Sequence, residues 1–242
     1  MSIKAILFDK DGTLLDFDAF WVTVAQRAVE YTLNSIGRTD IDPDEILRAM
    51  GVNDGITSID GVLCYGTHEQ VSERIYGVLK KYDVSVSESE IGDISRDGFH
   101  ESLSAGVLKG TCEDIYEVLK KLKDKGIKLA VVTADDEYMT EKCLSGLGIY
   151  TLFDKIYTND GITPPKPDPY CIHDLCQREG FDASEVLMVG DTLTDANFAK
   201  NGGIKMIGVA NSERNKEILS PYAFKVVPDI SYLYDLLEEV EA

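Results

Sequence analysis

"FDKDGT", residues 8–13, ends the first apolar run of the chain, which begins at Ile3. The run is apolar almost throughout, as expected for a parallel β-strand that is covered on both faces. Two carboxylates, Asp9 and Asp11, follow where this strand ends, and Gly12 comes directly after them. This pattern fits a turn, a metal site or a nucleophile, and only the rest of the chain can separate the three.

Further apolar runs of strand length follow in the second half of the chain, with helical patterns between them. Strand and helix therefore alternate, which predicts an α/β fold with a doubly wound parallel sheet, a Rossmann-like core. The later runs are 127–133, 155–158, 186–191, 205–210 and 224–227.

Residues 17–105 interrupt this alternation, because their segments carry helix-like spacing or helix-start signals. We predict an inserted all-helical cap domain at 17–105, with the core built from 1–16 and 106–242. Within the insert, residues 50–68 are rich in glycine and poor in charge. This segment is either the loop that faces the active site or a plain connection between helices.

Composition limits the partners of the protein. The net charge of -19, from 43 acidic and 24 basic residues, disfavours nucleic acid as a partner. No run approaches the roughly 18 apolar residues of a membrane span, and the N-terminus lacks a signal-peptide pattern. We therefore expect a cytoplasmic protein without a membrane partner, and a monomer as the default.

Polar residues follow three of the predicted strands at the same edge of the sheet. Asp9, Thr133 and Asp191 stand at these strand ends, and Asp195 lies one helical turn beyond Asp191. Lys166 is presented by a proline-rich loop before a helix. Because ligands of open parallel sheets bind beyond the carboxyl ends of the strands, we expect these side chains to converge there.

Such a set of residues suits phosphoryl transfer. Asp9 and Asp191, together with the backbone carbonyl of Asp11, offer the hard oxygen ligands that Mg²⁺ prefers. A carboxylate beside Mg²⁺ can attack phosphorus, so Asp9 is the candidate nucleophile. Asp11, two residues further on, can protonate the leaving oxygen and later deprotonate water.

The remaining candidates would hold the phosphoryl group. Lys166 would neutralise its oxygens, and Thr133 with the backbone amides of Gly12 and Ala134 would donate hydrogen bonds to it. Thr13 is assigned to the same phosphate-binding set. Asp195 would support the metal ligands from behind.

These residues resemble the four motifs of the haloacid dehalogenase superfamily. "DKDGT" (9–13) is similar to the first motif, the threonine of "VVT" (131–133) to the second, the lysine of "KPDP" (166–169) to the third, and "GDTLTD" (190–195) to the fourth. The helical insert is similar to the small cap of the phosphoglycolate phosphatase-like and beta-phosphoglucomutase-like branch. The resemblance implies a Mg²⁺-dependent phosphatase that hydrolyses a small phosphorylated metabolite, a phosphate monoester, through an aspartyl-phosphate at Asp9.

Alternatives stay open at this point. A sugar phosphomutase of the beta-phosphoglucomutase type would use the same core, and a non-catalytic protein that binds phosphate esters would keep the same fold. A dehalogenase or a phosphonate hydrolase is disfavoured because neither needs the carboxylate of Asp11. Phosphoglycolate, sugar phosphates, nucleotides and pyrophosphate all remain possible substrates.

Three further residues receive simple interpretations. Alternation along a strand predicts that Asp9 and Asp11 lie on one side and Lys10 on the other, so that Lys10 points away from the phosphoryl group. Lys10→Leu should then leave turnover within about tenfold, whereas Asp11→Asn should cost on the order of 100-fold or more. Asp135 and Asp136 precede a helix and are interpreted as capping residues.

Overall fold

The computed structural model describes residues 2–241, without the side chains of residues 65, 238, 239 and 241. The chain forms two compact units, a core unit of Met1–Asp16 with Leu108–Ala242 and a helical unit of Phe17–Val107. Residue 107 belongs to the helical unit, where its backbone amide donates to the carbonyl of Ala19 at 3.3 Å.

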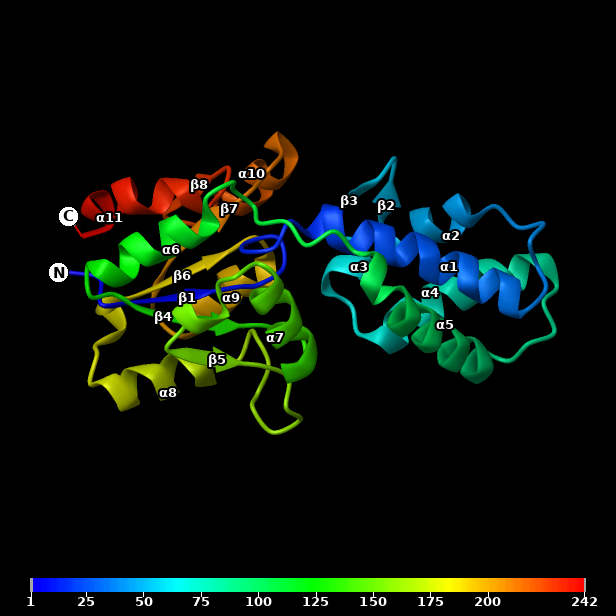
Figure 1. Cartoon of the computed structure of the whole chain (residues 1–242), viewed down its shortest axis with the longest axis horizontal. Coiled ribbons are helices and arrows are strands. Elements are labelled where there is room, and N and C mark those ends of the chain that lie inside the picture. The colour runs from blue at the N-terminus through cyan, green and yellow to red at the C-terminus, as the bar shows by residue number, and fades with distance from the viewer. Residues whose placement is uncertain (1, 242) are drawn as a thin grey trace. The chain divides into compact units, whose positions relative to one another are not determined.

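The core unit contains a parallel sheet of six strands in the order β5-β4-β1-β6-β7-β8 (Figure 1). The strands are β1 (Ala5–Phe8), β4 (Lys128–Val132), β5 (Lys155–Tyr157), β6 (Val186–Gly190), β7 (Lys205–Val209) and β8 (Lys225–Val227). All six lie within the apolar runs of the sequence, and the predicted doubly wound α/β fold is confirmed. The strands β1, β4, β5 and β6 each end one residue before the polar residue that closes the run.

Helices cover both faces of this sheet, as Figure 1 shows. They are α6 (Ile115–Asp124), α7 (Glu137–Gly146), α8 (Tyr170–Glu179), α9 (Leu193–Asn201), α10 (Glu213–Leu219) and α11 (Leu233–Glu241). In β1, Ile6 and Phe8 pack with side chains of α6 and α11, whereas Ala5 and Leu7 pack with side chains of α8 and α9. Because both faces of β1 are buried, the strand is apolar at every position.

The strand order determines where a ligand can bind. From β1 the chain goes to β4 and β5 on one side, and β6, β7 and β8 continue on the other side. The register pairs Phe8 with Val131 of β4 and with Val189 of β6, so these three strands end together. The residues that follow β1, β4 and β6 therefore lie at the switch point of the sheet.

The helical unit packs its helices around a separate apolar core that includes Val29, Ile46, Ile75 and Ile91. Its helices are α1 (Thr23–Ser35), α2 (Pro43–Met50), α3 (Val62–Tyr65), α4 (His68–Leu79) and α5 (Glu88–Ser102). A short π-helix (Asp18–Val22) precedes α1.

The prediction of an all-helical insert is wrong in one respect. Residues 50–68 contain a small antiparallel hairpin of β2 (Val52–Asn53) and β3 (Ile56–Thr57). Asp54 and Gly55 turn the chain with positive φ angles of 50° and 78°. The side chain of Asp18 accepts hydrogen bonds from the Thr57 amide at 3.0 Å and hydroxyl at 2.6 Å, which anchors the hairpin within the helical unit.

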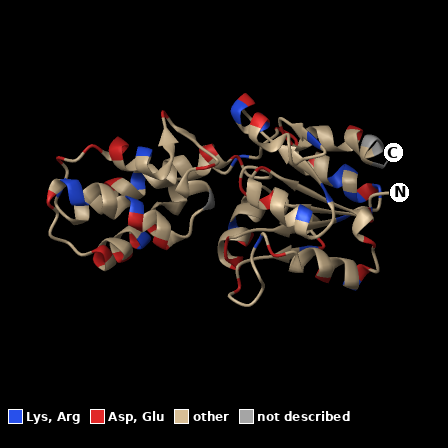
Figure 2. Cartoon of the chain, turned by 180° about the vertical axis from the view of Figure 1, so that it is seen from behind, with Lys and Arg blue, Asp and Glu red and all other residues tan. Residues whose placement is uncertain are grey.

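Charge is distributed over both units, with acidic positions scattered along their helices and loops (Figure 2). This agrees with the net charge of -19. Within residues 2–241, the helices are too short or too polar to cross a lipid bilayer.

Candidate active site

Asp9 stands directly after β1 and continues its pairing with β6, because its amide donates to the carbonyl of Val189 at 2.9 Å. The residue is 8% exposed. Its carboxylate oxygen Oδ1 accepts the amide of Lys10 at 2.7 Å and lies 2.7 Å from the Nζ of Lys166. The candidate nucleophile is therefore held by one local and one distant contact.

Lys166 joins two of the predicted carboxylates. Its Nζ lies 2.7 Å from Oδ1 of Asp9 and 2.7 Å from Oδ1 of Asp195. Burial lowers the pKa of Lys166, but the two carboxylates together raise it by a larger amount, so the net shift of the pKa is upward. The ammonium is charged and lies between residues that are far apart in the sequence.

Asp195 is fully buried, and both of its oxygens are engaged. Oδ1 binds Lys166, while Oδ2 accepts the amide of Thr192 at 3.0 Å and its hydroxyl at 2.6 Å. Thr192 and Asp195 form the capping box that begins α9. A side chain at position 190 would lie 2.5 Å from Cβ of Asp195, so Gly190 permits this close approach.

Thr192 is a site residue that the sequence interpretation did not single out. The threonine followed by an acidic residue three positions later is a capping-box signal, and it could have revealed the residue.

The loop after Asp9 packs against Asp191. The hydroxyl of Thr13 donates to Oδ1 of Asp191 at 3.1 Å. Gly12 has a φ of +76°, and a Cβ at this position would lie 2.1 Å from Oδ2 of Asp191. Only glycine fits this combination of a left-handed backbone and a carboxylate in contact.

Two residues that the sequence assigns to phosphate binding, Gly12 and Thr13, also make hydrogen bonds within the protein. The amide of Gly12 donates to the carbonyl of Leu15 at 2.8 Å, because the chain turns back at this point. The hydroxyl of Thr13 is used by Asp191. Gly12 and Thr13 therefore shape the surroundings of Asp191, and their assignment to phosphate binding stays a prediction.

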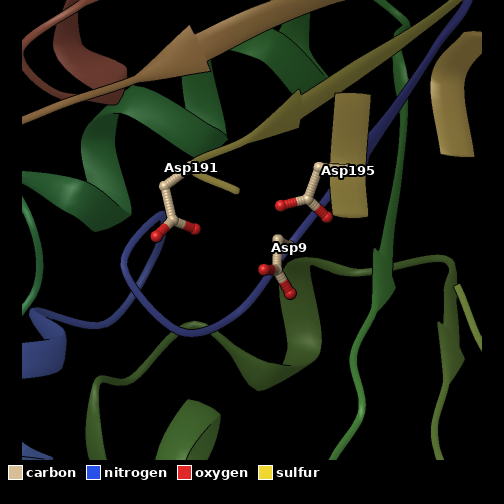
Figure 3. A group of neighbouring side chains, drawn as sticks. All are labelled: Asp9, Asp191 and Asp195. Carbon is tan, nitrogen blue, oxygen red and sulfur yellow. The ribbon is translucent and has the colours of Figure 1, made fainter. Parts of the chain in front are cut away.

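Three carboxylates gather beyond the ends of β1 and β6. Oxygen atoms of Asp9, Asp191 and Asp195 all lie within 4.8 Å of one another, and Figure 3 shows the three side chains grouped around a common space. Burial, together with the charge of Asp195, raises the pKa of Asp9 to about 7, although Lys166 opposes the shift. Burial and the charges of Asp9 and Asp195 also raise the pKa of Asp191 well above its ordinary range.

This cluster fits a divalent cation. Carboxylates that repel one another in a buried site lose this cost when a cation with two charges binds between them. Asp9 and Asp191 offer hard oxygen donors of the type that Mg²⁺ selects. Asp195 already uses both oxygens for Lys166 and Thr192, which suits a supporting position better than direct ligation.

Thr133 and Ala134 follow β4, the strand beside β1. Thr133 is 8% exposed, and its amide donates to the carbonyl of Tyr157 at 3.1 Å. Its hydroxyl oxygen accepts the amide of Asp135 at 3.2 Å. Ala134 is exposed at the same edge of the sheet.

Lys10 contradicts the interpretation made from strand alternation. Its Nζ lies 2.6 Å from Oδ2 of Asp11 and 3.0 Å from Oδ2 of Asp135. The reason is that β1 ends at Phe8, so the alternating geometry of a strand no longer holds at residues 10 and 11. Asp136 caps α7 as predicted, by accepting the amide of Met139 at 2.8 Å, but Asp135 pairs with Lys10 instead of capping.

Comparison with known proteins decides the family. The sequence profile of the haloacid dehalogenase-like hydrolases matches residues 6–209, which include every candidate residue described above. The chain belongs to this family.

Curated relatives in the haloacid dehalogenase-like family carry two kinds of names. The chain is similar to the pyrophosphatase PpaX of Bacillus velezensis, with 29% identity over 91% of this chain and 89% of that protein. It is also similar to the phosphoglycolate phosphatase of Psychrobacter arcticus, with 25% identity over 87% of this chain and 84% of that protein. These names support a phosphatase within the haloacid dehalogenase-like hydrolases.

Solved structures support the fold. A Thermotoga maritima protein provisionally assigned as a beta-phosphoglucomutase superimposes with a TM-score of 0.71 and 23% identity, over 98% of this chain and 100% of that one. The shared fold includes the helical insert as well as the Rossmann-type sheet.

Proposed function

We propose that this phosphatase of the haloacid dehalogenase-like family is Mg²⁺-dependent and hydrolyses a small-molecule phosphate monoester through an aspartyl-phosphate on Asp9. The observation that carries the proposal is the position of Lys166. Its buried ammonium lies 2.7 Å from an oxygen of Asp9 and 2.7 Å from an oxygen of Asp195, so one cation stands beside the candidate nucleophile. A cation placed beside a carboxylate nucleophile is the arrangement that a transferring phosphoryl group requires.

Asp9 performs the first displacement. The Lys10 amide and the Lys166 ammonium both contact Oδ1, so we assign the attack on phosphorus to Oδ2. As the new oxygen–phosphorus bond forms, the bond from phosphorus to the ester oxygen breaks, and that oxygen takes a proton from Asp11. In the second displacement Asp11 removes a proton from water, the water oxygen attacks phosphorus, and Asp9 is released with inorganic phosphate.

The phosphoryl oxygens need donors during both steps. We assign Lys166 to their charge, and the Thr133 hydroxyl with the Ala134 amide to hydrogen bonds from the neighbouring strand end. Thr133 is buried and Ala134 is exposed, so this edge of the site combines a fixed donor with an accessible one.

Mg²⁺ would be held by the carboxylates of Asp9 and Asp191 and the backbone carbonyl of Asp11. When bound, the ion offsets the repulsion between the carboxylate nucleophile and the phosphate ester. Asp195 then keeps Lys166 in place from the other side, and Thr192 keeps Asp195 in place.

The proposed substrate is a small phosphorylated anion. The names of the relatives include phosphoglycolate phosphatase and pyrophosphatase, and both act on small phosphorylated anions. We propose that the helical unit serves as the cap that selects the leaving group, and we retain water as the acceptor, a monomeric state and a cytoplasmic location as parts of the proposal.

A phosphate-release assay over a panel of phosphorylated metabolites tests this function. The panel includes 2-phosphoglycolate, pyrophosphate, hexose phosphates and nucleotides, with Mg²⁺ present or chelated. We expect phosphate release by the wild type and none by Asp9→Asn. The matched control is Asp154→Asn, because Asp154 binds the Leu129 amide at the amino ends of the strands, away from the candidate site.

The outcomes separate the possible functions. Conversion of a hexose phosphate to its isomer without free phosphate indicates a phosphomutase and contradicts the proposal. Tight binding of an ester that is never consumed indicates a binding protein. A radiolabelled ester should leave label on the wild-type protein after an acid quench and no label on Asp9→Asn.

A further inference from the structure

Lys10 lies in the loop that follows β1, and its side chain takes no part in the displacements proposed for Asp9 and Asp11. Its exposed fraction is 0%, and its Nζ lies 2.6 Å from Asp11 and 3.0 Å from Asp135. Asp135 comes from the loop after β4, two residues beyond Thr133. A lysine from one strand end is thus held by a carboxylate from the next.

A buried ammonium group at this position has an energetic cost that an apolar side chain would not have. Moving an ammonium group out of water costs several kcal/mol even after the surroundings relax. Burial lowers the pKa of Lys10, but Asp11 and Asp135 together raise it by a larger amount. The side chain of Lys10 is therefore charged. Burial and the charge of Asp11 raise the pKa of Asp135 to about 6, against the opposing effect of Lys10. Packing alone would be served better by leucine at this position.

Lys10 also connects the two carboxylates of the first motif. Its backbone amide donates to Oδ1 of Asp9, and its backbone carbonyl accepts the amides of Leu14 and Leu15 at 2.9 Å. These bonds close the turn that brings the side chain of Asp11 back towards Nζ. One residue therefore contacts the nucleophile through its backbone and the acid–base residue through its side chain.

We propose that Lys10 is a positioning residue that fixes the carboxyl group of Asp11 for proton transfer, with Asp135 holding the ammonium from the other side. This inference rests on the proposed function and assigns Lys10 a specific part in it. The carboxyl group of an unrestrained aspartate samples several rotamers, and its contact with a buried cation selects one of them before the substrate arrives.

The test compares two esters whose leaving oxygens differ in basicity. An alkyl phosphate releases a strongly basic alkoxide that needs the proton of Asp11, whereas p-nitrophenyl phosphate releases a stable phenolate that does not. The measured quantity is kcat/KM, which reports the steps up to departure of the leaving group and excludes hydrolysis of the aspartyl-phosphate. For Lys10→Met we expect kcat/KM to fall on the order of 10- to 100-fold more for the alkyl ester than for the nitrophenyl ester.

Two further variants keep the test decisive if Lys10→Met folds poorly. The double variant Lys10→Met, Asp135→Asn also removes the carboxylate that would otherwise lose its lysine partner, so its folded state is easier to keep. The single variant Asp135→Asn retains the lysine and removes its outer partner. Both should show the same selective loss with the alkyl ester, and thermal unfolding establishes that each is folded at the assay temperature.

The result that overturns the inference is an equal loss for both esters, or no loss, in a folded Lys10 variant. Such a result would leave Lys10 with a structural role only. Failure of the proposed function looks different, because the wild type would then release phosphate from neither ester, and the role of Lys10 would be withdrawn with it. The selective pattern must also be absent from Asp154→Asn, which changes a carboxylate distant from Asp11.

Discussion

The carboxylates that make the site reactive should also destabilise the metal-free protein, and Asp9→Asn exposes this cost. The pKa of Asp9 is raised from an ordinary value near 3.8 to about 7 in the folded state, first by burial and then by Asp195. The folded state therefore binds more protons than the unfolded state between these two values. Stability falls as the pH rises through this window, and the loss is complete above about pH 7.

The magnitude follows from the width of the window. Of the window between 3.8 and about 7, the part above pH 5 covers about 2 pH units, and each pH unit is worth about 1.36 kcal/mol. The wild type therefore loses up to about 3 kcal/mol from this group between about pH 5 and about pH 7. Asparagine at position 9 does not titrate, so the variant does not lose this stability. We compare the melting temperature of the core unit in Asp9→Asn and in the wild type. For a chain of this size, the difference between the two should grow by roughly 6 to 12 °C from about pH 5 to about pH 7.

The assay is thermal unfolding of the metal-free wild type and Asp9→Asn from about pH 5 to about pH 8. The variant should be inactive yet more stable at the upper end, and Mg²⁺ should stabilise the wild type more than the variant. Asp154→Asn is the control: burial opposes the shift, but the hydrogen bonds from Leu129 and Lys123 keep the pKa of Asp154 below its usual range. Its effect should be destabilising and constant over this pH range. Parallel pH profiles for the wild type and Asp9→Asn would refute the reasoning.

Three other predictions concern the same site. Gly12→Ala places a Cβ 2.1 Å from Asp191 at a positive φ, so turnover should fall on the order of 100-fold or more with a lower melting temperature; a variant with wild-type kcat contradicts the close packing. Asp191→Asn should raise the Mg²⁺ concentration needed for half-maximal activity. Asp195→Asn should instead lower kcat, because Lys166 loses one of its two carboxylate partners, and should change that Mg²⁺ concentration less. The same response in both variants would show that the two residues do not have distinct roles. Chelation should abolish phosphate release, and added Mg²⁺ should restore it; activity that persists in excess chelator contradicts the metal dependence.

The strands of the core could be predicted because burial on both faces leaves a strong signal. Each of the six strands is an almost continuous apolar run, and a polar residue directly after β1, β4, β5 and β6 marks the edge of the sheet. Asp9, Thr133 and Asp191 were identifiable in this way before the structure. The helices between the strands were also clear, because their apolar residues recur at helical spacing and glycine or capping residues mark their ends.

The hairpin of the helical unit was missed for a physical reason. Each of its strands has only two residues, too few for an alternating pattern to appear. The turn signal was present in Asp54 and Gly55, both of which have positive φ. Its anchor is Asp18, which lies far away in the sequence, and no local pattern connects it with Thr57.

The sequence by itself determined the sheet, its edge and the residue types that stand there, because apolar runs and strand ends are local properties. Only the tertiary structure decided which partners those residues take. Lys166 meets Asp9 and Asp195, and Lys10 lies between Asp11 and Asp135, because the segments that follow different strands converge at one edge of the sheet. Pairings of this kind depend on distances between segments that are remote in the chain, and a linear pattern does not contain them.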